Sequence, residues 1–272
     1  MILHDMSMPT LALAIEANFT EEMACFGRAR KRWEYHKTPE LFWVYTDPSE
    51  LNGVLLSSFA SDDETYVNAK IDEILDFYTS RHTSFDWTTG PSTYPASLAT
   101  LLEERGFVQV HVTTGMAVDL HALNEQVQVN TSLVIKEVED LDALRTLCNI
   151  EMRGFGTSEE GAQRYYDTYA NAGFGIGLPW HHYAGWLHDT PVASASLLYH
   201  AGVAGIYGVS TIPEARRRGI AASITLHALR EARDMGYRVA VLSPTDMSEA
   251  IYRRMGFQDY CTLLHYEWTL EE

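Results

Sequence analysis

Two spacings of apolar residues alternate along the first half of the chain and predict an α/β fold. Between residues 68 and 81, Ile71, Ile74, Leu75 and Tyr78 recur every three or four positions, which places them on one face of a helix. Runs rich in β-branched and aromatic residues predict strands at 41–46, 53–59, 85–88 and 107–120. Two more helices are predicted, one from Pro9 to residue 28 and one that begins at Pro95 and ends at Gly106.

The second half repeats this plan with clearer boundaries. Asp140 and Ser158 are expected to cap two helices, because short polar side chains accept hydrogen bonds from the first free amides of a helix. Gly236 and Gly256 are expected to end two more. The predicted helices are 140–152, 158–171, 219–235 and 248–255, and the predicted strands are 133–138, 182–188, 192–199, 205–211, 239–243 and 260–268.

The two halves also resemble each other. Residues 101–107 and 251–257 both predict a short helix that ends in Gly-Phe and precedes a strand. We interpret this as a tandem duplication, with the boundary in the polar segment 121–130, so that the domains are 1–128 and 129–272. The alternative is one composite α/β domain, since a helix that ends in Gly-Phe is common.

Composition narrows the possible partners. The 272 residues carry a formal net charge of −17, which repels nucleic acid and suits a cationic or neutral ligand. Three widely spaced cysteines argue against a disulfide framework and a metal site, and they favour a reducing cytoplasm. We expect no signal peptide and no membrane span.

The densest basic cluster is Arg216-Arg217-Arg218, which follows a predicted strand and precedes Gly219 at the start of a helix. The first amides of a helix lack internal partners and carry partial positive charge. Small residues there allow a phosphate to approach the backbone, and arginines add forked donors. The turn therefore predicts a site for a phosphorylated cofactor, although most basic triplets are only solvated surface charges.

Two motifs together resemble the GNAT superfamily of acyl-CoA-dependent N-acyltransferases. They are Arg216-x-x-Gly219-x-Ala221 after a strand, and Ala250-Ile251-Tyr252-x-x-x-Gly256-Phe257 downstream. The resemblance covers residues 129–270, although Asp246 stands where the family often has asparagine. It implies tandem GNAT-like α/β domains, each a mixed central sheet flanked by helices, of which the domain 129–272 binds acetyl-CoA and transfers the acetyl group to an amine.

The resemblance also implies residue roles. Main-chain groups of Val209, Ser210 and Thr211 would pair with the pantetheine arm. Tyr252 would face the thioester sulfur as the catalytic residue. The pyrophosphate and the 3′-phosphate would be held by the amides and side chains of the turn, namely Arg216, Arg217, Arg218, Gly219, Ile220, Ala221 and Ala222.

The first half lacks these features and is expected to be structural. Asp62-Asp63-Glu64 precedes its long helix and would repel a pyrophosphate, and Leu102 replaces the tyrosine.

Several questions stay open at this stage. The acceptor is a small-molecule or peptide amine, the protein is a monomer or homodimer, and the general base is unassigned. Candidates for that base are Glu151, His181, His182 and Asp246. The alternative function is a non-catalytic acyl-CoA sensor or an interaction module that keeps a vestigial fold.

Overall fold

The computed structural model describes residues 2–29, 33–46 and 51–270. The chain forms two compact units, and each is assembled from two separate segments. The large unit comprises Met1–Cys25 and Gly115–Tyr260, and the small unit comprises Phe26–Thr114 and Cys261–Glu272. Among the described residues no helix is long and apolar enough to cross a membrane.

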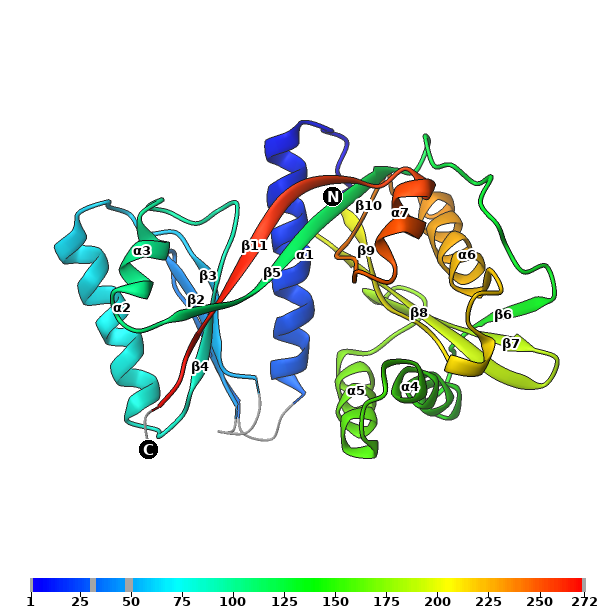
Figure 1. Ribbon diagram of the computed structural model, residues 1–272, viewed down its shortest axis with the longest axis horizontal. Helices are drawn as coiled ribbons and strands as arrows, with labels where there is room; N and C mark the ends of the chain where they lie inside the picture. Colours follow the sequence, from blue (N-terminus) through cyan, green and yellow to red (C-terminus); the bar gives the residue numbers. More distant parts are fainter. Residues whose placement is uncertain (1, 30–32, 47–50, 271–272) are drawn as a thin grey trace. The chain divides into compact units, whose positions relative to one another are not determined.

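The large unit is built on a mixed sheet (Figure 1). Four strands pair antiparallel in sequence order, namely β6 (Leu133–Glu137), β7 (Trp180–Leu187), β8 (Thr190–His200) and β9 (Val203–Thr211). The strand β10 (Val239–Leu242) runs parallel to β9, and its other edge pairs antiparallel with the end of β5 (Val108–Asp119).

Helices cover both faces of this sheet. Figure 1 shows α4 (Leu141–Phe155) and α5 (Glu159–Ala172) on one face, and α6 (Ile220–Asp234) on the other. Two further helices of this unit are α7 (Glu249–Met255) and most of α1 (Met8–Arg28). Asp140 and Ser158 accept hydrogen bonds from the third amides of α4 and α5, so both predicted caps are confirmed.

The small unit has a second mixed sheet with the same strand directions. Its strands β1 (Glu34–Lys37), β2 (Leu41–Tyr45) and β3 (Gly53–Ser57) are antiparallel, and β4 (Phe85–Thr89) is parallel to β3. The end of β11 (Gln258–Trp268) completes the sheet beside β4. Its helices are α2 (Glu64–Thr79) and α3 (Leu98–Glu103).

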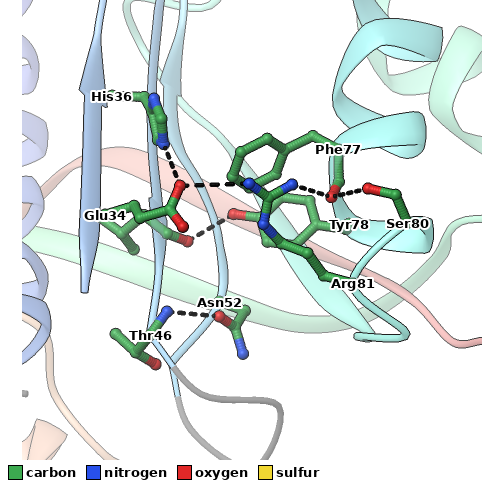
Figure 2. Close-up of polar contacts among 9 residues, drawn as sticks. Glu34, His36, Thr46, Asn52, Phe77, Tyr78, Ser80 and Arg81 are labelled. Carbon is green, nitrogen blue, oxygen red and sulfur yellow. Dashed lines mark hydrogen bonds and ion pairs between the residues drawn. The ribbon is translucent and has the colours of Figure 1, made fainter. Parts of the chain in front are cut away.

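A dense aromatic core and a polar cluster hold α2 against the strands of the small unit (Figure 2). The hydroxyl of Tyr78, at the buried end of α2, donates to the carbonyl of Val44 in β2. The Arg81 guanidinium lies 3.8 Å from the centroid of the Phe77 ring and forms an ion pair with Glu34 at 3.4 Å. These contacts give the small unit a core of its own.

The two units do not coincide with the predicted domains 1–128 and 129–272. The last strand of the first half pairs within the large unit, and the last strand of the second half pairs within the small unit. Residues 116–119 of β5 pair with β10, and residues 264–268 of β11 pair with β4. Strand pairing between distant segments leaves no local signal in the sequence, so the compact units could not be predicted from composition. The duplication itself stays a prediction.

Three predicted elements differ from the structure. The helix expected from Pro95 begins at Leu98, because residues 95–98 form a turn in which the Leu98 amide donates to the Pro95 carbonyl at 3.1 Å. The helix expected over 68–81 begins at Glu64, where Asp63 caps it. The strand β1 was not predicted, because its four residues are mostly polar. The α/β class with helices flanking mixed sheets is confirmed.

Candidate active site

The centre of the candidate site is the point where two parallel strands of the large unit separate. The strands β9 and β10 pair only at Ala204 and Gly205, and from there to Thr211 β9 is paired with β8 but not with β10. On its other edge β9 bulges, because Tyr207 and Ser210 lie opposite Ser196 and Ser194. One extra residue in β9 increases its local twist.

The bulge depends on Gly208, whose φ of +57° is readily adopted by glycine. Its carbonyl accepts a hydrogen bond of 2.8 Å from the Ser194 hydroxyl. The three predicted pantetheine-binding residues, Val209, Ser210 and Thr211, lie directly after this bulge on the strand that leaves β10. Their main chain is therefore placed to pair with an extended ligand.

The arginine turn follows at the end of β9. A short 3₁₀ helix, Pro213–Ala215, leads into Arg217 at φ +60° and Gly219 at φ +73°, and α6 begins at the next residue. No side chain caps α6. Across the described residues, the amides of Gly219, Ile220, Ala221 and Ala222 find no hydrogen-bond acceptor. Four free amides at a helix start form an anion site.

The three arginines divide into two kinds. Arg217 and Arg218 are exposed, and in the described part of the chain neither forms an ion pair. Arg216 instead donates from Nε to the carbonyl of Thr211 at 3.1 Å and from Nη2 to that of Gly154. Arg216 therefore ties the turn to the ends of β9 and α4, whereas Arg217 and Arg218 are available to an anionic ligand.

Gly219 was expected to let a phosphate approach the backbone, but the structure shows another chain segment packed against it. A Cβ at Gly219 would lie 3.0 Å from the carbonyl oxygen of Gln128 and 3.0 Å from the carbonyl carbon of Val129. The missing side chain therefore makes room for the segment 128–130. Asn130, which the sequence did not single out, fastens that segment by donating from Nδ2 to the carbonyl of Arg218 at 3.1 Å.

Tyr252 lies on α7 with 6% of its surface exposed. Its phenol is near the hydroxyls of Ser248 and Thr225, and the Thr225 hydroxyl has no hydrogen-bond partner among the described residues. Burial raises the pKa of Tyr252 to about 12, against a smaller lowering by these hydroxyls. The phenol is therefore protonated at neutral pH and serves as a donor.

Glu151 on α4 lies against the bulge of β9. A Cβ at Gly208 would be 2.3 Å from its Oε1, and the residue is 1% exposed. Neither carboxyl oxygen has a hydrogen-bond partner within the described chain. Burial, and then the nearby Glu22 of α1, raise the pKa of Glu151 to about 8. Buried polar groups are nearly always paired, so this carboxyl needs an explanation.

The remaining base candidates differ in their surroundings. His182 is fully buried and bonds Ser196 at 2.7 Å through Nδ1, and burial lowers its pKa to about 3, so the ring is neutral. His181 points to the other face and contacts Glu137 at 2.8 Å. Asp246 is exposed. The described residues contain no group of three His, Cys, Asp or Glu side chains able to hold a metal ion.

In the described part of the small unit, the start of α2 offers no comparable anion site. Asp63 caps α2 by accepting from the amide of Tyr66 at 2.9 Å, so a carboxylate occupies the helix start. Leu102, at the position that matches Tyr252, is fully buried in the core.

Comparisons with known proteins agree with this geometry. Residues 199–259 match the family model of the acetyltransferase (GNAT) domain. A GCN5-related N-acetyltransferase from Kribbella flavida aligns over 92% of this chain and 95% of its own, with a TM-score of 0.68 at 18% identity. A tandem GNAT protein from the clavulanic acid biosynthesis pathway aligns over 88% of this chain and 84% of its own, with a TM-score of 0.69 at 11% identity.

A GCN5-related N-acetyltransferase from Sphaerobacter thermophilus is also similar, with a TM-score of 0.57 at 16% identity over 76% of this chain and 69% of its own. A search of curated proteins found no match. The match over residues 199–259 includes both predicted motifs, and the fold of the chain is similar to that of GNAT acetyltransferases, as the resemblance predicted.

Proposed function

We propose that the protein is an N-acetyltransferase that uses acetyl-CoA and transfers the acetyl group to an amine by direct attack. The observation that carries this proposal is the anion cradle at the start of α6, directly after a strand that leaves its neighbour. Free amides and two exposed arginines suit the phosphates of CoA, and the edge of β9 that has left β10 suits its amide-containing pantetheine arm.

Each residue of the turn has a distinct part in this proposal. The amides from Arg217 to Ala222 hold the pyrophosphate, and Arg217 and Arg218 supply charge to the phosphates. Arg216 positions the turn through its bonds to Thr211 and Gly154. In a protein of net charge −17, such a local cluster is needed to hold an anionic substrate.

The thioester supplies an activated acyl group with a thiol leaving group, and the chain supplies position and hydrogen bonds. Transfer of a proton from a phenol of pKa about 12 to a thiolate of pKa about 8.5 is uphill by about 5 kcal/mol. Tyr252 therefore stabilises developing charge on the sulfur as a hydrogen-bond donor.

The test is release of free CoA thiol from acetyl-CoA by the purified protein with amines, polyamines, amino acids, aminoglycosides and peptides. The proposal expects thiol release that depends on an amine. If CoA raises the melting temperature but no amine releases thiol, the protein is the non-catalytic acyl-CoA sensor. If CoA does not bind, both readings are wrong.

A further inference from the structure

The large unit contains a pair of carboxyl groups that the cofactor site does not use. Glu151 of α4 and Glu22 of α1 are close enough for the charge of Glu22 to act on Glu151. Glu22 keeps part of its surface exposed, whereas Glu151 is 1% exposed with both oxygens unpartnered among the described residues. The argument for a ligand therefore rests first on Glu151.

The pair lies beside the bulge of β9. Glu151 fills the space over Gly208, and the Ser196 hydroxyl is 3.5 Å from the same Cβ position. Ser210, two residues along β9, is buried with an unpartnered hydroxyl within the described chain. These unmet polar atoms gather where β9 has left β10, next to the main chain proposed to hold the pantetheine arm.

The groups around the pair are neutral and mostly aromatic. Within the described structure, no cation contributes to the raised pKa values of Glu22 and Glu151, which arise from burial and, for Glu151, from Glu22. Burial also raises the pKa values of Cys148, Tyr165, Tyr169 and Tyr207, so these groups stay protonated. The titratable groups that act on these four in turn are Cys25 on Tyr207, Arg145 and Asp167 on Cys148, and Arg164 on Tyr165.

We propose that Glu151 and Glu22 form the acceptor site, that this site selects a cationic amine with no carboxylate next to it, and that Glu151 takes the amine's proton. This inference rests on the proposed acyl transfer. A buried carboxyl pair with no cation of its own provides the charge that an ammonium group needs, and aromatic rings also favour a cation. A carboxylate on the acceptor would be repelled by the carboxyl that the ammonium group ionises.

The proton balance is simple. The ammonium group gives one proton to the Glu151 carboxylate, and the freed lone pair of nitrogen forms a C–N bond to the thioester carbonyl carbon. The C–S bond breaks, and its electron pair leaves with the sulfur of CoA. Nitrogen then loses a second proton. One of the two protons ends on the thiol and the other passes to solvent.

The experiment measures binding apart from turnover. The protein is saturated with CoA and titrated at pH 7 with phenethylamine or tyramine, and with their carboxylate counterparts phenylalanine and tyrosine. Calorimetry in buffers of different ionisation enthalpy counts the protons released. Each amine should bind at least tenfold more tightly than its counterpart, with release approaching one proton per amine, because an ammonium beside protonated carboxyls ionises one of them.

Two matched variants assign the effect. Glu151→Gln should weaken amine binding at least tenfold and remove most of the proton release, whereas CoA affinity should be unchanged. Glu160→Gln makes the same chemical change at an exposed position of α5 and should leave all values unchanged. If Glu151 had only a structural role, Glu151→Gln would not change the number of protons released per amine bound.

The outcomes distinguish failure of the acceptor site from failure of the proposed acetyltransferase function. Three results would overturn the acceptor site: equal binding of amines and amino acids, no binding of either amine, or unchanged amine binding by the Glu151→Gln protein. Thiol release with other acceptors would still support acyl transfer. Amine binding with proton release but no thiol release from acetyl-CoA would keep the acceptor site and refute the transferase.

Discussion

At the residue scale, environment decides which titratable groups can act. A lysine-type ammonium of pKa about 10.4 gives its proton to an ordinary glutamate at a cost of about 8 kcal/mol. For Glu151, whose pKa is about 8 in the unliganded site, the cost is about 3 kcal/mol before a bound ammonium lowers that pKa. From the sequence alone Glu151 is only one of four candidate bases, because nothing local shows that Gly208 and Glu22 lie beside it.

Replacing Glu151 should change how stability depends on pH. The folded pKa of about 8 is raised above the model-peptide value of 4.5, so the folded protein binds more protons than the unfolded chain between these values, and stability falls as pH rises through this window. Removing the group should therefore raise the free energy of unfolding more at pH 8.5 than at pH 5, by at most about 5 kcal/mol, and the melting temperature should rise with it. Melting curves of wild type, Glu151→Gln and Glu160→Gln measure this difference. A Glu151→Gln shift that is equal at both pH values would contradict the assignment.

Tyr252 should support the chemical step more than binding. Because the pKa of its phenol is about 12, it acts as a donor, and we expect Tyr252→Phe to lower kcat by about 10²-fold, the low end for such roles. The dissociation constant of CoA should hardly change, since the anion cradle lies at the start of α6. An unchanged kcat would remove Tyr252 from the mechanism, and a loss of CoA binding would make it a structural residue.

At the element scale, the site depends on how closely α4 approaches β9. Gly154 of α4 has no side chain, and a Cβ there would lie 1.7 Å from the Ser210 hydroxyl. The sequence predicted β9, the turn and α6 because their signals are local: a strand pattern, arginines and a glycine. It did not predict the contact of Gly154 with Ser210, because the packing of a helix such as α4 against a strand such as β9 leaves no short-range pattern in the sequence.

Gly154→Ala should therefore displace the Ser210 side chain and press against β9. Alanine favours a helix over glycine by about 1 kcal/mol, but the clash with β9 should outweigh this gain and destabilise the fold by about 1–3 kcal/mol. Gly161→Ala is the matched control, because its nearest neighbour is the Thr157 side chain at 3.3 Å. Urea unfolding compares the two variants. If Gly154→Ala is as stable as Gly161→Ala, the close packing of α4 on β9 is not what shapes the site.

At the scale of the whole molecule, two similar sheets carry different helix starts. In the large unit the start of α6 leaves its amides free, whereas in the small unit Asp63 fills the start of α2 with its own carboxylate. The sequence predicted this difference from the acidic residues 62–64. It could not predict that β5, from the first half, pairs with β10, or that β11, from the second half, pairs with β4. These partners are more than a hundred residues apart in the sequence, so no local pattern indicates them.

One CoA should therefore bind per chain. Calorimetric titration of the wild type should give a stoichiometry of one, because Asp63 and Glu64 exclude a pyrophosphate from α2. Arg217→Gln combined with Arg218→Gln should weaken that single site at least tenfold. Two sites per chain in the wild type would contradict the account of the small unit.

The central claim is that acetyl-CoA bound at the arginine turn gives its acetyl group to an amine. The direct measurement uses acetyl-CoA with a ¹³C-labelled acetyl group and the best acceptor amine, and follows CoA thiol and labelled product by mass spectrometry. We predict one labelled N-acetyl amine per thiol released. The Arg217→Gln, Arg218→Gln double variant should lower kcat/KM for acetyl-CoA at least tenfold, while Arg164→Gln, an exposed control on α5, should not. Thiol release without labelled amine, or equal kcat/KM in the double variant and the control, would contradict the account.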